Sequence, residues 1–181
     1  WQLAAPAQDR HALARSLLRE LLGDETHFSS VCPHCGGAHG PVRAQRPHGQ
    51  APLVSITYSG PLVVVGAAPA LAVAFGIDAE IDSEDHRRAV SEAIGSAELY
   101  DWTRLEAVAK ARRTGLRDEV RALDYTGDTH GWIAEPAPGL PGLCGVDLTL
   151  TLPGEHGTAL LSVALAAAVP PPGTPTTFLP S

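Results

Sequence analysis

The stretch ALAVAFGIDAEI, residues 70–81, predicts a β-strand that ends in two acidic residues. Side chains two residues apart in a strand lie on the same face of its sheet, so Asp78 and Glu80 are expected to project together. Ile77 and Ala79 are then expected to face the other way. This strand decides the fold, because it lies between two similar groups of helices and strands.

One helix and two strands are predicted before this strand. Residues 9–23 have apolar residues at helical spacing, an Asp where the N-cap should be and a Gly where the helix should stop. Residues 53–60 and 61–68 predict two strands joined by a Ser-Gly-Pro turn. Residues 32–52 are so rich in Gly, Pro and His that we expect neither a helix nor a strand there.

Two helices and three strands are predicted after it. The helices cover residues 83–95, with Ser83 as N-cap, and residues 99–116. The order of elements favours an α+β fold of two similar lobes that meet near residues 68–74, although no sequence repeat supports a duplication. The three strands are predicted at residues 131–136, 144–153 and 158–169.

Composition excludes several classes of protein. A chain of 181 residues, 44% of them hydrophobic, can bury a core of its own. The formal net charge of −7 argues against nucleic-acid binding, which needs clustered Lys and Arg. The longest apolar run, residues 62–75, is too short for a membrane span. Three cysteines, Cys32, Cys35 and Cys144, form no even disulfide framework, so we expect a reducing cytoplasm.

The acidic pair of the central strand predicts a metal site. Asp78 and Glu80 would repel each other if both were ionised on one face. A divalent cation relieves this repulsion, and Mg²⁺ is suited to the role because it binds hard oxygen ligands and bridges carboxylates to phosphates. The alternative is a solvated strand end, since D-x-E sequences also arise by chance.

A second acidic group lies on the predicted helix that contains WTRLEAVAK. Trp102, Glu106 and Lys110 are four residues apart and share one face of that helix. Lys110 is the only lysine beside twelve arginines. The alternative is an ordinary surface pair of Glu106 and Lys110, which would contribute about 0.3–0.5 kcal/mol.

Together the two segments resemble the surfactin-type 4'-phosphopantetheinyl transferases. The pattern of that family is G-I/V-D-x-E, followed by W-S/T-x-K-E-A/S-x-x-K and a Gly-Leu turn. Upstream, ARSLLRELLG, CPHCGGAHG and VSITYSG resemble segments of its actinobacterial members and occur in the same order. The matching residues are Gly76, Ile77, Asp78, Glu80, Trp102, Thr103, Glu106, Ala107, Lys110, Gly115 and Leu116.

The resemblance implies a pseudo-twofold arrangement of the two α+β lobes, with the active site in the cleft between them. We expect an N-terminal lobe over residues 1–70 and a C-terminal lobe over residues 71–169 that carries the metal and catalytic motifs. A Pro-rich tail over residues 170–181 is expected to be disordered or laid on the surface.

The resemblance also implies a reaction. A serine hydroxyl of an apo acyl or peptidyl carrier protein attacks the pyrophosphate of coenzyme A, and adenosine 3',5'-bisphosphate leaves. Asp78, Glu80 and Glu106 are the implied Mg²⁺ ligands; Glu106 also takes the serine proton, and Lys110 stabilises the leaving phosphate. We expect a cytoplasmic monomer. The residues implied to bind coenzyme A are Arg15, Arg43, Arg46, Tyr58, Ser59 and Lys110.

Three positions depart from the family pattern. Pro41 stands where members carry a basic residue, Tyr58 where they carry His, and Leu105 where they carry Lys. Each change removes a charge or donor expected to face coenzyme A, where a charge-assisted hydrogen bond contributes about 1.5–3 kcal/mol. The three arginines just named could compensate. The alternative is a degenerate, non-catalytic relative that binds a partner or nucleotide through the same cleft.

The cysteine-rich loop has two interpretations. Cys32, Cys35 and His39, with His34 or Cys144 as a fourth ligand, could hold a structural zinc ion. A single C-x-x-C is only half of such a site, and an ordinary loop is the simpler interpretation.

A group of arginines also has two interpretations. They could dock an acidic helix of the carrier protein or only solvate the ends of helices. The group consists of Arg87, Arg88, Arg112, Arg113 and Arg117.

Overall fold

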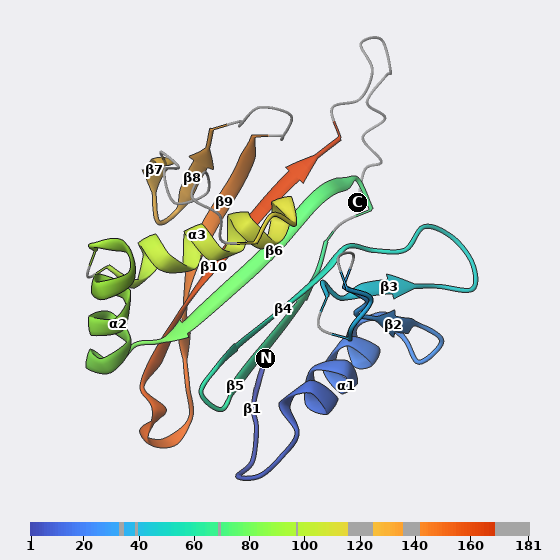
Figure 1. Cartoon of the computed structure of the whole chain (residues 1–181), viewed down its shortest axis with the longest axis horizontal. Helices are drawn as coiled ribbons and strands as arrows, with labels where there is room; N and C mark the ends of the chain where they lie inside the picture. Colours follow the sequence, from blue (N-terminus) through green and yellow to red (C-terminus); the bar gives the residue numbers. More distant parts are fainter. Residues whose placement is uncertain are drawn as a thin grey trace, which may run out of the picture.

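The computed structural model describes residues 1–32, 35–38, 40–68, 70–96, 98–115, 125–135 and 142–168. These residues form a mixed α+β fold, which confirms the predicted class (Figure 1). The predicted tail at residues 170–181 lies outside the described residues. The helices in the described part of the chain are α1 (Arg10–Leu22), α2 (Glu84–Ile94) and α3 (Leu99–Arg112).

The strands form two larger antiparallel sheets and a short ribbon. The N-terminal sheet has the order β1-β5-β4, with β1 at Gln2–Leu3, β5 at Leu62–Ala67 and β4 at Val54–Ser59. The ribbon pairs β2 (His27–Ser29) with β3 (Arg43–Gln45). The C-terminal sheet has the order β6-β10-β9-β8-β7, with β6 at Ala72–Ile81, β10 at Thr158–Ala167, β9 at Leu143–Thr151, β8 at Gly131–Ala134 and β7 at Tyr125–Asp128.

Side-chain caps start the first two helices where the sequence predicted them. The Asp9 carboxylate accepts from the amide of His11 at 2.9 Å and begins α1. Ser83 accepts from the amide of His86 at 3.2 Å and begins α2, which Gly95 ends in the left-handed conformation. Two consecutive turns of α1 bury apolar side chains against β5.

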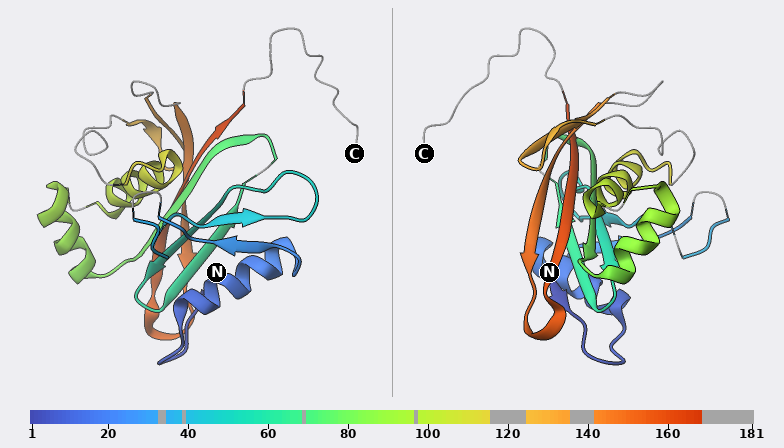
Figure 2. Two further views of the ribbon diagram at one scale, coloured as in Figure 1. Left: turned by 45° about the vertical axis from the view of Figure 1, so that its right-hand side comes forward. Right: turned by 90° about the vertical axis from the view of Figure 1, so that its left-hand side faces the viewer.

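Helix α3 packs on one face of the C-terminal sheet. The right-hand view of Figure 2 shows this sheet edge-on, with α2 and α3 on the same side of it. Leu105 and Val108 of α3 share a core cluster with Trp132 of β8 and Ala164 of β10. A Cβ atom on Gly76 would lie 2.1 Å from the Ala107 carbonyl oxygen, so only glycine lets α3 approach β6 this closely.

The other face of β6 packs against the N-terminal sheet. Leu62 and Val64 of β5 meet Ile77 and Ala79 of β6 and Leu161 of β10 in a second core cluster. Both faces of β6 are therefore covered, which fixes the strand that carries the acidic pair.

Most predicted elements are confirmed within one to four residues, including the three helices and the strands around residues 53–81. The N-terminal sheet ends its last strand at Ala67, and the C-terminal sheet begins its first strand at Ala72. The prediction of no strand over residues 32–52 is wrong, because Arg43–Gln45 forms β3. In the described part of the chain, no helix has the length and apolar character needed to cross a bilayer.

Candidate functional site

Side-chain hydroxyl groups join the two sheets where β4 lies beside β6 (Figure 1). Ser55, Thr57 and Ser59 alternate along β4, and all three are buried. Each hydroxyl oxygen accepts a hydrogen bond from a backbone amide of β6, although the two strands belong to different sheets. The distances are 3.1 Å from Ile77 to Ser55, 3.4 Å from Ala79 to Thr57 and 2.9 Å from Ile81 to Ser59.

We call this row of contacts between the β4 hydroxyl groups and the β6 amides the seam. Asp78 lies at the seam and is only 4% exposed. Its Oδ1 accepts from the hydroxyl of Thr57 at 2.7 Å and from Nζ of Lys110 at 2.6 Å. Among the described residues, its buried Oδ2 has no hydrogen-bond partner. Burial raises the pKa of the Asp78 carboxyl, and the charge of Lys110 offsets only part of that effect.

Glu80 projects from the same face of β6 as Asp78, as predicted. Its Oε2 accepts from the Ser59 hydroxyl at 2.6 Å and lies 3.4 Å from Nδ1 of His86. That nitrogen is also 2.8 Å from the Ile81 carbonyl oxygen, which can only accept, so Nδ1 carries the hydrogen. Burial and the nearby Asp78 charge raise the pKa of Glu80, against the effect of Ser59.

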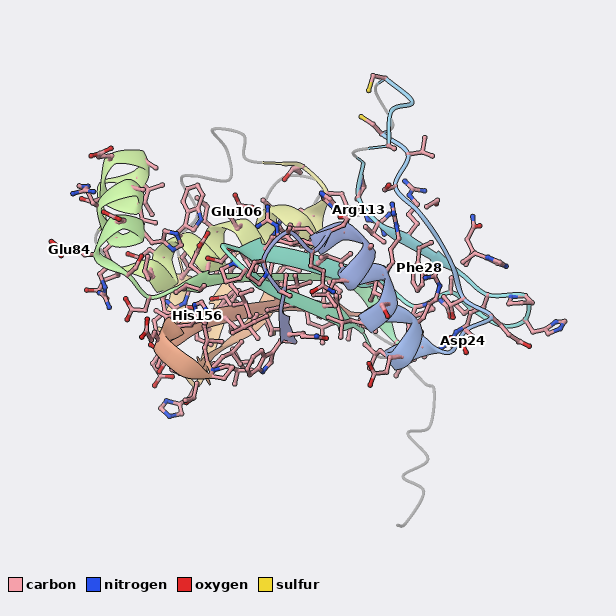
Figure 3. The ribbon with its side chains drawn as sticks, turned by 90° about the horizontal axis from the view of Figure 1, so that it is seen from below. Asp24, Phe28, Glu84, Glu106, Arg113 and His156 are labelled. Atoms are coloured by element: carbon pink, nitrogen blue, oxygen red, sulfur yellow. The ribbon has the colours of Figure 1, made fainter. Side chains whose placement is uncertain are left out.

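Glu106 reaches the site from α3. Burial raises the pKa of its carboxyl, and the charges of Asp78 and Glu80 raise it further. Figure 3 labels Glu106 in the middle of the molecule, between Glu84 of α2 and Phe28 of β2 in that view. The three predicted carboxyl groups are thus close enough to act on one another electrostatically.

Their side chains do not form a complete metal cluster. Within the described ranges, no group of three His, Cys, Asp or Glu residues is arranged to hold a metal ion. The donor chemistry nevertheless fits Mg²⁺, because carboxylate oxygens are its preferred ligands and Asp78 has a buried oxygen without a hydrogen-bond partner in the described part of the chain. The metal site remains a prediction.

A cavity of about 380 Å³ lies between β4, β6, α3 and residues 40–42. Tyr58, Glu106 and Lys110 line it, as does Pro41. Arg113 lines it too, at the end of α3, with a positive φ of 57°. The sequence places Arg113 in the group of arginines that could dock a carrier helix or solvate the ends of helices, and it does not predict that Arg113 lines a cavity.

A second cavity of about 300 Å³ lies between α2 and α3. Glu80, His86 and Trp102 line it together with small apolar residues of α2. The candidate site therefore presents Glu106 and Lys110 to the larger cavity and Glu80 to the smaller one.

The residues predicted to bind coenzyme A are only partly brought together. Tyr58 and Lys110 line the larger cavity, whereas Arg15, Arg43 and Arg46 do not. Arg46 instead donates to the carbonyl of Leu22 at 3.2 Å. Ser59 also lies outside the cavity lining, and its hydroxyl is hydrogen-bonded to Glu80.

The three departures from the family pattern have different surroundings. Leu105 is 4% exposed and packs in the core, so its side chain does not line the larger cavity. Pro41 does line the larger cavity. The Tyr58 hydroxyl is 3.2 Å from Nδ1 of His11, and the Arg10 guanidinium lies 5.6 Å from the Tyr58 ring centroid.

The docking interpretation of the arginine group is wrong for Arg112. That side chain is buried and donates to the carbonyl of Glu135 at 2.6 Å. Arg87 and Arg88 form ion pairs with Asp82 and Asp85, which reduces the local positive charge. Arg117 lies outside the described residues.

The zinc site in the cysteine-rich loop stays a prediction. Cys144 lies on β9, where it is exposed, and Cys35 is exposed on the loop that follows the buried Cys32. His34 and His39 lie outside the described residues.

A buried polar network was not predicted. Asp147 of β9 accepts from Arg104 of α3 at 2.9 Å, from the Trp132 indole at 2.8 Å and from Ser162 at 2.7 Å. Ser162 in turn lies 2.7 Å from the Thr103 hydroxyl. The network ties α3 to the sheet beside Glu106. Its members are far apart in sequence, so no local pattern could have identified it.

The chain matches no family model, no curated protein and no solved structure.

Proposed function

We propose that this protein transfers the 4'-phosphopantetheine group of coenzyme A to a serine of an apo acyl or peptidyl carrier protein, with Mg²⁺. The observation that carries the proposal is the arrangement around Asp78. Glu106 and Lys110 line one cavity, Glu80 lines the other, and Lys110 contacts Asp78. Two cavities, each lined by one of the acidic residues Glu106 and Glu80, suit a reaction that joins two substrates.

The reaction exchanges one phosphorus–oxygen bond for another. The serine oxygen bonds to the phosphorus that carries phosphopantetheine, and the bond from that phosphorus to the bridging oxygen of the pyrophosphate breaks. Adenosine 3',5'-bisphosphate leaves with the bridging oxygen. A bound Mg²⁺ would supply stabilisation of charge on the phosphate oxygens, and Asp78, Glu80 and Glu106 would hold it.

Glu106 accepts the serine proton in this proposal. Its carboxyl group lines the larger cavity, where coenzyme A would bind in this proposal. Lys110 stabilises the negative charge of the departing bridging oxygen. In the structure the Lys110 ammonium contacts Oδ1 of Asp78 at 2.6 Å. To stabilise the leaving oxygen, it must leave Asp78 and contact the substrate in the larger cavity, which Lys110 lines.

The larger cavity would bind coenzyme A. Arg113, Tyr58 and Lys110 all line it and would donate hydrogen bonds to the phosphates. The N-terminal sheet with α1 and the C-terminal sheet with α2 and α3 would be the two pseudo-twofold lobes of the proposed family. The three cysteines support a cytoplasmic location as part of the same proposal.

The test is mass spectrometry of a panel of apo carrier proteins after incubation with coenzyme A and Mg²⁺. We expect the parent protein to add phosphopantetheine to at least one carrier, and Glu106→Gln to abolish the addition. Glu20→Gln, an exposed change on α1, is the matched control and should retain activity. If no carrier is modified by the parent protein, the transferase proposal is wrong and the non-catalytic alternative replaces it.

A further inference from the structure

The hydroxyl groups of β4 have a fixed hydrogen-bond direction. An amide can only donate, so each hydroxyl oxygen that accepts from a β6 amide has its own hydrogen left to donate. Thr57 accepts from the amide of Ala79 and donates to Asp78 at 2.7 Å. Ser59 accepts from the amide of Ile81 and donates to Glu80 at 2.6 Å.

The two contacts repeat with the period of the strands. In each, the hydroxyl bridges a β6 amide and the carboxylate of the residue that precedes this amide. Ser55 makes the third amide contact, to Ile77, but the preceding residue is Gly76, which has no side chain. Ser55 therefore contributes to the seam without contacting a carboxylate.

The bridges select one oxygen of each carboxylate. Thr57 and Lys110 both meet Oδ1 of Asp78, and the buried Oδ2 is left without a partner within the described part of the chain. Ser59 and His86 both meet Oε2 of Glu80. Because a β6 amide fixes the position of each hydroxyl oxygen, the hydroxyl hydrogen lies next to the carboxylate, which is thereby held from the neighbouring sheet.

We propose that Thr57 and Ser59 are positioning residues for a divalent cation. They hold Asp78 and Glu80 so that Oδ2 of Asp78, and not Oδ1, is presented to the metal. This inference deepens the proposed function, on which it rests for the presence of the cation. Partners that orient metal ligands in this way typically change metal affinity by about 10–100-fold when they are removed.

The experiment measures Mn²⁺ binding to the metal-free protein by electron paramagnetic resonance, with Mg²⁺ competition. Thr57→Val and Ser59→Ala remove the hydroxyl hydrogens and should each weaken Mn²⁺ binding at least about tenfold. Thr57→Ser keeps the hydroxyl and should restore nearly the parental affinity. Ser55→Ala is the matched control, because it breaks the same kind of seam contact and should leave affinity within about twofold.

Thermal unfolding of the same variants separates positioning from folding. All three hydroxyl deletions should lower Tm, since each leaves a buried amide without its acceptor. If Thr57→Val does not fold, Ser59→Ala and Thr57→Ser decide the question. Equal Mn²⁺ affinities in the folded variants, an equal loss in Ser55→Ala, or no Mn²⁺ binding by the parent would each overturn the inference.

Failure of the proposed function gives a different result. If the variants lose Mn²⁺ affinity as expected but the parent protein modifies no carrier, the positioning role stands and the transferase proposal is wrong. If the parent protein modifies a carrier and the deletions leave Mn²⁺ affinity unchanged, the transferase proposal stands and the positioning role is wrong.

Discussion

Lys110 contacts a buried acid and lines a cavity at the same time. Its Nζ lies 2.6 Å from Oδ1 of Asp78, a residue that is only 4% exposed. Loss of one partner of such a pair leaves an uncompensated buried carboxyl group, although the Lys110 side chain is itself 31% exposed and solvent screens part of the effect. The lone lysine therefore has a structural role before any substrate binds.

The first prediction concerns this structural role. Lys110→Ala should lower the free energy of unfolding by about 1–3 kcal/mol, because the buried Asp78 carboxyl group loses the cation that contacts its Oδ1. Urea unfolding at neutral pH without metal measures it. In the double variant Asp78→Asn/Lys110→Ala, the loss should be smaller than the sum of the two single losses. Additive losses would mean that the ion pair contributes nothing to stability.

The second prediction concerns Lys110 in catalysis. If its ammonium stabilises the leaving phosphate, Lys110→Ala should lower kcat by about 10²–10³. Lys110→Arg should restore only part of kcat, because the planar guanidinium keeps the charge but cannot place it as a compact ammonium does. Initial rates of carrier modification at saturating coenzyme A provide the measurement. Equal rates for parent and Lys110→Ala would remove Lys110 from the mechanism.

The third prediction separates two sets of arginines. Arg113 lines the larger cavity, and Arg113→Ala should weaken binding of coenzyme A by about 10–100-fold, as expected for loss of one charge-assisted hydrogen bond. Arg43→Ala, on the exposed side of β3, should leave the affinity unchanged. Isothermal titration calorimetry measures both. The reverse result would favour the binding residues predicted from the sequence over those that line the cavity.

At the scale of elements, periodic patterns and caps were sufficient for most of the fold. The Asp9 and Ser83 caps and the alternation along β6 each follow from a rule that acts within a few residues. The ribbon of β2 and β3 could not be predicted in this way, because strands of three residues depend on the partner that they pair with.

The candidate site shows the same limit. Spacing on one strand and one helix predicted that Asp78 shares a face with Glu80, and Glu106 with Lys110. It could not predict that Lys110 contacts Asp78, which requires α3 to pack on β6. The burial of Leu105 has a related reason: motif spacing assigns residues to helix faces, but only packing decides which face is buried.

The fourth prediction follows from the contact between α3 and β6. Gly76→Ala would place a Cβ 2.1 Å from the Ala107 carbonyl oxygen, so the helix or the strand must move. We expect the free energy of unfolding to fall by about 1–3 kcal/mol. Gly131→Ala is the control, because a Cβ there meets no atom within 4 Å. Equal stabilities of the two variants would mean that α3 does not pack this closely on β6.

At the scale of the whole molecule, the buried carboxyl groups of the site lower the free energy of unfolding at neutral pH. Burial raises the pKa of Asp78, Glu80 and Glu106 above the ordinary value for carboxyl groups. The folded protein therefore holds these protons at pH values where the unfolded chain has released them. Since stability rises with pH only where the unfolded chain binds more protons, these three groups make stability fall as pH rises.

The fifth prediction is the resulting pH dependence. Without metal, the three carboxyl groups should contribute most to the free energy of unfolding below the ordinary carboxyl pKa of about 4. This contribution should be lost as pH rises through their raised pKa values in the folded protein. Glu106→Gln should flatten this fall in the free energy of unfolding. Glu20→Gln, which makes the same change in net charge at an exposed position, should not.

Mg²⁺ should restore stability at neutral pH in the parent protein and less in Glu106→Gln, because a bound cation stabilises the ionised carboxylates. Urea unfolding between pH 4.5 and 8, with a chelator or with Mg²⁺, measures both effects. A stability that rises with pH over this range and does not respond to Mg²⁺ would contradict the electrostatic account of the site.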